Sequence, residues 1–237
     1  MNAHVVYRGE LRGGLGEAPR AIATCLVDLG LPCHLACAVC WRAGPPQVGG
    51  LAAARNHLLA AASCAPAERL RAVFYGGDVF TAPHAFAALL ADAGAACEEH
   101  GRALEALVLS DGVGWTGEAV RDLARRGVRL VQVTLEGRAE VHDRQRPLAG
   151  GAGSFSHILA SLRRRGGMPV VVRMNALAGD GEVDALAGVL DREGLFGGEN
   201  PVRLFVSPPA PYREQVLELL ELVEQVPAAA RADPARA

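Results

Sequence analysis

Short apolar runs alternate along this chain with longer amphipathic segments. The runs are rich in Val and Leu and do not alternate with polar residues, which predicts strands covered on both faces. Six strands are expected, at 21–29, 70–75, 104–109, 128–135, 169–174 and 202–206. Helical spacing predicts helices at 50–63, 82–99, 116–126, 153–165, 182–193 and 211–225. This order predicts an α/β fold with a parallel sheet and right-handed crossovers, and leaves open whether the sheet is doubly wound or a partial barrel.

The chain divides into three parts. We expect an N-terminal segment at 1–19, a core domain at 20–226, and a low-complexity, disordered tail at 227–237. Its 237 residues can build a full core without disulfides. The chain has no secretory h-region and no apolar stretch of the ~18–20 residues that a membrane span needs, so we expect a cytoplasmic protein without a membrane partner.

Composition excludes several kinds of chemistry. The net charge of −2 gives no sign of a nucleic-acid partner. All 24 basic residues are arginine. Without lysine the protein can form neither a Schiff base nor the phosphate-binding loop that needs an invariant lysine.

Polar and glycine residues follow each predicted strand. In parallel α/β folds the carboxyl ends of the strands meet at one edge, where ligands bind. The residues expected there are Cys33–Cys40, Gly76-Gly77-Asp78, Ser110-Asp111-Gly112, Thr134 with Glu136, Asn175, and Ser207-Pro208-Pro209. This edge is the candidate functional site.

Three cysteines after the first strand have the spacing of a metal site. Cys33, Cys37 and Cys40 form a C-x3-C-x2-C motif. Three thiolates can hold one iron–sulfur cluster and leave an iron open to a small molecule. A structural zinc site is an alternative that lacks an obvious fourth ligand. A redox pair of Cys37 and Cys40 would leave Cys33 unexplained.

The other three cysteines lie inside apolar segments. We interpret Cys25, Cys64 and Cys97 as buried small residues rather than ligands.

Together the motifs resemble the radical SAM superfamily, whose signature is C-x3-C-x2-C after the first strand of a partial (β/α)6 barrel. AVFYGGDVF resembles the GGE loop of this superfamily, and LVLSDG resembles its TNG segment. LVQVTLEG, followed by VHDRQRP and GGAGSF, is similar to a run in anaerobic sulfatase-maturing enzymes and SPASM-type peptide maturases. The resemblance covers roughly residues 20–210 and implies a partial barrel with parallel strands.

The resemblance also implies cofactors and their contacts. Cys33, Cys37 and Cys40 would hold a 4Fe–4S cluster, and S-adenosylmethionine (SAM) would bind the open iron. Arg146 would meet the carboxylate of SAM, and the other implied contacts are Val39, Gly76, Gly77, Asp78, Thr134, Val206 and Ser207. One electron from the cluster would cleave SAM to methionine and a 5′-deoxyadenosyl radical, which abstracts hydrogen from a substrate.

The implied substrate is a peptide, with a small molecule as the alternative. A reductant such as a flavodoxin or ferredoxin would supply the electron, and a separate protein could deliver the peptide. The sequence departs from the pattern in ways that also permit a non-catalytic iron–sulfur protein with a degenerate SAM site. Val39 replaces an aromatic residue and Asp78 replaces Glu, and no cysteine follows Cys97 to form the SPASM extension.

Three further groups of polar residues have more than one possible role. We expect His34 to face solvent within the cysteine loop. His142-Asp143-Arg144 could form a proton relay, but a positioning role is favoured. Arg173 and Asn175, at the end of the fifth predicted strand, either line the core or reach a ligand.

Overall fold

The computed structural model describes residues 5–7, 22–38, 40, 50–65, 67–175, 180–198, 200–208 and 212–224. The strands are β1 (Val5–Tyr7), β2 (Ile22–Asp28), β3 (Arg69–Tyr75), β4 (Ala103–Ser110), β5 (Val128–Thr134), β6 (Val170–Asn175) and β7 (Arg203–Ser207). The helices are α2 (Gly50–Cys64), the short η1 (Val79–Thr81), α3 (Pro83–Glu99), α4 (Gly117–Arg125), α5 (Ala139–Gln145), α6 (Phe155–Arg163), α7 (Asp180–Arg192) and α8 (Tyr212–Glu224). Val39 and the tail at 227–237 lie outside the described residues.

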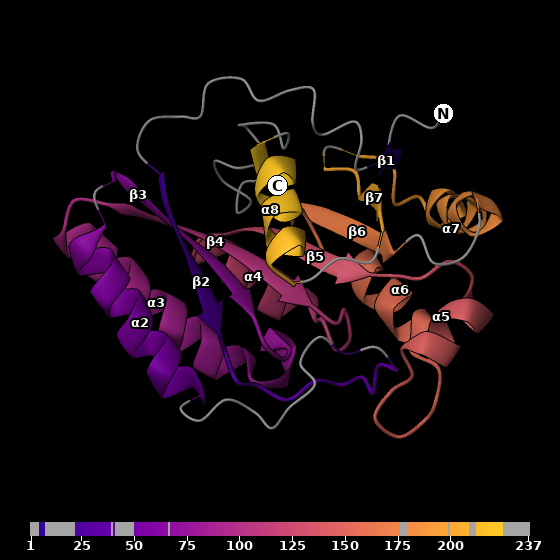
Figure 1. The fold of residues 1–237 in the computed structure, drawn as a ribbon, viewed down its shortest axis with the longest axis horizontal. Helices are drawn as coiled ribbons and strands as arrows, with labels where there is room; N and C mark the ends of the chain where they lie inside the picture. Colours follow the sequence, from indigo (N-terminus) through magenta and orange to yellow (C-terminus); the bar gives the residue numbers. More distant parts are fainter. Residues whose placement is uncertain are drawn as a thin grey trace.

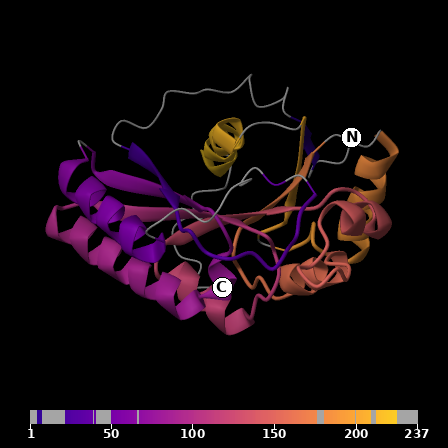
Figure 2. The ribbon, with the colours of Figure 1, turned by 60° about the horizontal axis from the view of Figure 1, so that its bottom comes forward.

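The strands form one parallel sheet in the order β1-β7-β6-β5-β4-β3-β2. The six predicted strands are all present, in chain order from β2 to β7. Within the described residues β1 and β2 are the two edges and do not pair with each other, so the sheet is open. The parallel pairing of the strands, which alternate with helices, confirms the α/β fold. The strong curvature of the open sheet identifies the architecture as a partial barrel (Figure 2).

Strand β1 is a finding that the sequence did not predict. It lies in the segment at 1–19 and pairs with β7, with Val5 opposite Leu204. Three residues are too few to show a periodicity, so only the pairing with a neighbouring strand reveals it.

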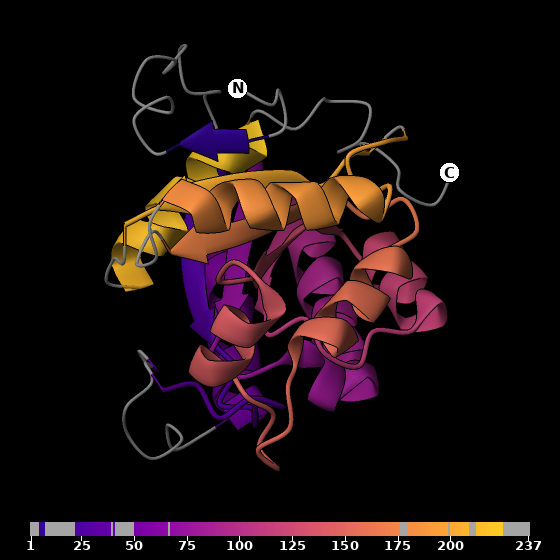
Figure 3. The same ribbon diagram turned by 90° about the vertical axis from the view of Figure 1, so that its right-hand side faces the viewer.

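Helices α2 to α7 cover the convex face of the sheet (Figures 1 and 3). Their apolar sides and the outward side chains of the strands form the main core, which includes Phe74, Phe86 and Trp115. The local sequence sets the helix ends. At the start of α4, for example, the Thr116 hydroxyl accepts a hydrogen bond from the Ala119 amide at 3.2 Å.

Among the described helices, α8 is the one that lies on the concave face (Figure 2). It builds a second, smaller core with inward side chains of β3 to β7. The sequence predicted this helix but not its side of the sheet. No helix in the described ranges is long and apolar enough to cross a membrane.

Candidate functional site

The cysteine loop lies at the carboxyl rim of the sheet and is held from two sides. On one side, the Leu31 amide donates to the Gly76 carbonyl and the Asp78 amide donates to the Pro32 carbonyl, both at 2.9 Å. On the other side, the Ala36 amide donates to Pro147 and the Ala38 amide donates to Gln145, both at 2.8 Å. The loops after β2, β3 and β5 therefore form one backbone framework, as the sequence predicted for this rim.

Two glycines allow the close approach of these loops. Gly76 and Gly77 have φ angles of +83° and +108°, which favour glycine. A Cβ on Gly77 would lie 2.0 Å from the Leu31 carbonyl oxygen, and one on Gly76 would lie 1.8 Å from an oxygen of Asp28. The Gly76-Gly77 turn thus places the backbone of the β3 loop directly against the cysteine loop.

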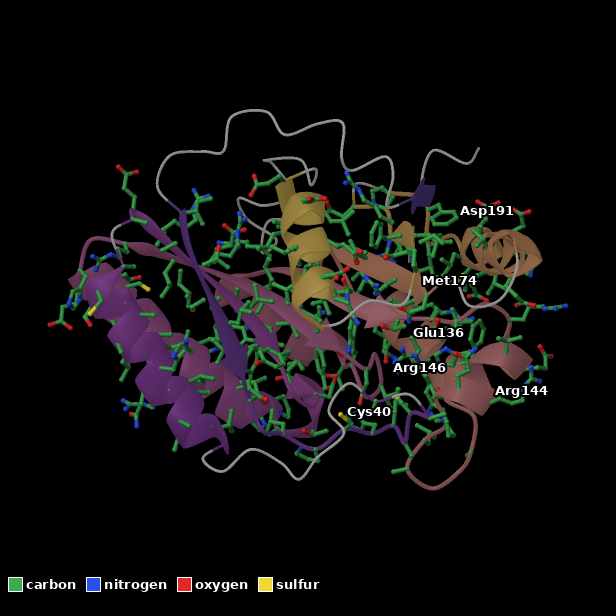
Figure 4. All side chains as sticks on the ribbon, viewed as in Figure 1. Cys40, Glu136, Arg144, Arg146, Met174 and Asp191 are labelled. Carbon is green, nitrogen blue, oxygen red and sulfur yellow. The ribbon has the colours of Figure 1, made fainter. Side chains whose placement is uncertain are left out.

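The three cysteines of the motif are free thiols on this loop. Cys33 and Cys40 are exposed and Cys37 is partly buried. Figure 4 shows Cys40 at the rim, on the same side of the sheet as Arg146. Burial raises the pKa of Cys33 to about 11, and the negative field of Asp111, Asp78 and the other two cysteines adds to this effect. Burial also raises the pKa of Cys37, so a bound metal that replaces the thiol protons favours the thiolate forms of Cys33 and Cys37.

A buried carboxylate network lies directly beneath the loop. The Asp78 side chain is fully buried and accepts hydrogen bonds from the Ser110 hydroxyl at 2.5 Å and from the amides of Asp111 and Phe80 at 2.7 and 2.8 Å. Burial, followed by the neighbouring Asp111, raises the pKa of Asp78 above its usual range. The structure thus shows protein donors on both oxygens of the Asp78 carboxylate.

His34 joins the cysteine loop to this network, so the expectation that it faces solvent is wrong. Its Nδ1 lies 3.1 Å from both Asp111 carboxylate oxygens, and its amide donates to Asp111 at 2.8 Å. His34, Asp78 and Asp111 offer metal-ligating atoms within 4.8 Å of one another. Both Asp78 oxygens already accept hydrogen bonds, so we interpret this group as the attachment of the loop to β4.

Arg146 connects the cysteine loop to the ends of β5 and β6. Its Nε and Nη2 donate to Glu136 at 2.9 and 2.7 Å, and its Nη1 lies 3.7 Å from the Cys37 sulfur. Glu136 is buried and also accepts from the backbone and side-chain amides of Asn175, at 3.0 and 2.6 Å. Figure 4 shows Glu136 and Arg146 next to each other. The structure therefore pairs Arg146 with the buried carboxylate of Glu136 and directs its Nη1 towards the cysteine loop.

The remaining predicted SAM contacts lie along β5 and β7. Thr134 ends β5 and is half-buried. The Val206 side chain belongs to the main core on the convex face, which leaves only its backbone for a ligand at the rim. The buried Ser207 hydroxyl donates to Glu218 of α8 at 2.8 Å. Glu218 is a site residue that the sequence analysis did not identify, because only the docking of α8 brings it to the rim.

Arg173 and Asn175 both occupy the concave side of β6. Arg173 is fully buried, pairs with Glu218, and donates to the Asn175 side-chain oxygen at 3.2 Å. The sequence left open whether these two residues line the core or reach a ligand. In the structure they form a buried polar link between Glu136 and α8.

Burial tests the interpretation of the other three cysteines. Cys97 is buried and Cys25 is partly buried, but Cys64 at the end of α2 is exposed, so its assignment as a buried residue is wrong. The helix ends at Cys64, and a proline follows two residues later in the sequence.

His142 and its neighbours hold the Arg146 segment in place. His142 Nδ1 accepts from the Glu136 amide at 3.2 Å, which puts the proton of the neutral ring on Nε2, 2.9 Å from the Ser154 hydroxyl. That hydroxyl donates to the Arg146 carbonyl at 2.5 Å, and Asp143 accepts from the Ser154 amide at 2.8 Å. These contacts support positioning rather than a proton relay.

Acid should destabilise the protein through His142. Burial, followed by the positive Arg146, lowers its pKa from 6.5 to about 4. The unfolded chain binds the proton first as pH falls, so stability is present above pH 6.5 and is lost towards pH 4. Between neutral and acidic pH, we expect the unmodified protein to lose about 2 kcal/mol more unfolding free energy than the His142→Gln variant. Urea unfolding of both proteins at the two pH values measures these losses. Equal losses in the two proteins would contradict the prediction.

Solved structures show which proteins share this fold. A structure of anSMEcpe with bound AdoMet and the Cp18Cys peptide has a TM-score of 0.61 at 14% identity, covering 78% of this chain and 51% of that chain. SuiB of Streptococcus suis bound to precursor peptide SuiA has a TM-score of 0.56 at 11% identity, covering 85% and 46%. Methylornithine synthase (PylB) has a TM-score of 0.52 at 11% identity, covering 86% and 63%.

These three proteins are radical SAM enzymes, so this chain has the fold of the radical SAM core. It spans about half the length of anSMEcpe and SuiB. No protein-family model matches the sequence, and no curated protein matches it.

Proposed function

We propose that this chain is a radical SAM enzyme that holds a 4Fe–4S cluster on Cys33, Cys37 and Cys40. The carrying observation is the position of the three-cysteine loop, which lies at the carboxyl rim between the Gly76-Gly77 turn and the segment at 145–147. Three thiols from one loop fit a cluster that keeps one iron open. When bound, the cluster supplies one electron to cleave SAM to methionine and a 5′-deoxyadenosyl radical, which takes a hydrogen atom from the substrate.

We assign SAM binding to Gly76, Gly77, Asp78, Thr134, Arg146, Val206 and Ser207 of the same rim, and to Val39, which precedes Cys40 in the sequence. Arg146 is suited to the carboxylate of SAM because a guanidinium has five donors. Its Nε and Nη2 hold Glu136, while Nη1 faces the cysteine loop. Glu136 therefore orients Arg146, and Nη1 is the donor directed to the place of the cofactor.

The proposed substrate is a peptide. Two structural neighbours contain peptides, Cp18Cys in anSMEcpe and the precursor SuiA in SuiB. We propose that a separate protein presents the peptide and that a flavodoxin or ferredoxin supplies the electron. A small molecule is the second candidate, because the methylornithine synthase PylB shares the fold over 63% of its length.

A cluster protein without SAM cleavage is the competing function. Two observations favour it: the Asp78 carboxylate is fully engaged by protein donors, and Arg146 is already paired with Glu136. Either contact could take the place of a contact to SAM.

Anaerobic reconstitution with iron and sulfide, followed by dithionite and SAM, separates the two functions. We expect formation of 5′-deoxyadenosine, measured by chromatography with mass detection. A reconstituted cluster that yields none would establish the non-catalytic function. Binding of zinc with no iron–sulfur absorption would exclude both.

A further inference from the structure

Helix α8 packs against the concave face of the sheet. Its apolar side lies on inward side chains from five consecutive strands. These residues are Val216, Leu219, Leu222 and Val223 of the helix, and Val73, Leu107, Leu130, Val171 and Phe205 of the sheet. These apolar side chains form the second core, between the helix and the sheet.

Two acidic residues anchor α8 to two arginines of the sheet. Glu218 pairs with the fully buried Arg173, near the carboxyl end of β6. Glu224, six residues later, pairs with Arg71 of β3 at 2.6 Å. The concave face therefore presents Arg173 near one end of an apolar strip and Arg71 near the other, where Arg71 also contacts Glu105 of β4 at 3.2 Å. An acidic, amphipathic segment is complementary to this arrangement.

This face also contains polar atoms that α8 leaves without partners. Gln132 of β5 is 3% exposed, and its neighbours Val131 and Val133 face the main core, so its side chain is on the concave side. Its Oε1 has no hydrogen-bond partner among the described residues, and neither does Nε of Arg71. Buried polar groups are nearly always paired in native proteins. These orphaned atoms indicate a face shaped for an occupant that can reach them.

The main core does not depend on α8. No residue of this helix belongs to the large cluster between the sheet and α2 to α7. Departure of α8 would expose only the smaller cluster on the concave face. The rest of the fold keeps its own core when the helix leaves.

We propose that the concave face is the binding groove for an acidic, amphipathic segment of the peptide substrate, and that α8 occupies it as an internal mimic of that segment. Carboxylates of the substrate pair with Arg173 and Arg71, and apolar side chains take the places of Leu219 and Leu222. An amide or hydroxyl donor of the substrate meets Gln132. This inference rests on the proposed function, because it specifies the kind of peptide that the enzyme takes.

The groove adjoins the candidate site through a chain of polar contacts. Arg173 bonds Asn175, which bonds Glu136, the partner of Arg146. A substrate segment that replaces Glu218 on Arg173 is therefore connected to Arg146 through Asn175 and Glu136.

A labelled peptide with the sequence of residues 212–224 tests the groove on the anaerobically reconstituted full chain. In the unmodified protein α8 competes intramolecularly, so we expect weak binding. The double variant Glu218→Gln/Glu224→Gln loosens α8, and we expect it to bind the peptide at least about tenfold more tightly by fluorescence anisotropy. The same peptide carrying both Gln replacements should lose most of this affinity.

Glu221→Gln is the matched control. It removes one negative charge from α8, where the double variant removes two, and Glu221 has no ion pair in the described part of the chain. Its peptide affinity should equal that of the unmodified protein. Hydrogen exchange should show faster exchange of α8 amides in the double variant alone, with β4 to β6 still protected.

The proposal would be overturned if the folded double variant binds no peptide and protects the amides of α8 from hydrogen exchange as well as those of β4 to β6. Helix α8 would then be a permanent part of the core. If the double variant does not fold, excess peptide is added to the unmodified protein. Faster exchange confined to α8 then supports the groove, and unchanged exchange overturns it. None of these readouts requires SAM cleavage, so they stand apart from the 5′-deoxyadenosine test.

Discussion

Replacement of Cys33, Cys37 and Cys40 by alanine is expected to lower the cluster content of the reconstituted protein about tenfold or more, and to abolish 5′-deoxyadenosine formation. The reason is the donor set, because an iron–sulfur cluster is held by thiolates and the loop provides three of them. The fold should survive, since Cys33 and Cys40 are exposed and contribute little to the core. Iron and sulfide analysis with visible absorption measures cluster content, and circular dichroism checks the fold.

Cys64→Ala is the control for this experiment. Cys64 is an exposed free thiol at the end of α2, outside the cysteine loop. Its replacement should leave iron content and activity unchanged. A triple variant that retains a full cluster would show that other residues hold the iron, and the assignment of the cysteines would be wrong.

Gly77→Ala is expected to have the second large effect. A Cβ at this position lies 2.0 Å from the Leu31 carbonyl oxygen and 2.4 Å from its carbon, both backbone atoms that no rotamer change can move. The cysteine loop must therefore shift away from the β3 loop. We expect a loss of about 3 kcal/mol or more in unfolding free energy, together with impaired cluster assembly. Urea unfolding and iron content measure the two effects.

Gly101→Ala separates this overlap from the cost of the backbone angle. Gly101 also has a positive φ, of +65°, but nothing lies within 4 Å of the added Cβ. We expect roughly 1–2 kcal/mol of destabilisation there, with normal cluster content. Similar losses from both substitutions would mean that the contact between Gly77 and Leu31 does not hold the cysteine loop.

The sequence by itself determined six of the strands, most of the helices and the composition of the rim. All six predicted strands are present because continuous Val- and Leu-rich runs identify strands that are covered on both faces. The same order of strands and helices predicted a parallel sheet, and with it the meeting of the cysteine loop and the Gly76-Gly77 turn at one edge. Local patterns were sufficient there because the strand periodicity and the parallel topology determine which loops meet.

Only the tertiary structure decided the partners of the charged groups. A sequence that places Arg146 near a rim cannot show that Glu136 already holds it, or that His34 binds Asp111. These pairings depend on contacts between separate loops at distances of about 3 Å, which no local pattern encodes.

The position of α8 was decided in the same way. Its amphipathic pattern predicts a helix with one buried side, and either face of the sheet could cover that side. The concave face receives it because Arg173 and Arg71 pair with Glu218 and Glu224 across the apolar strip. Side-chain complementarity between elements distant in the chain, not the propensity of either one, places this helix over the candidate site.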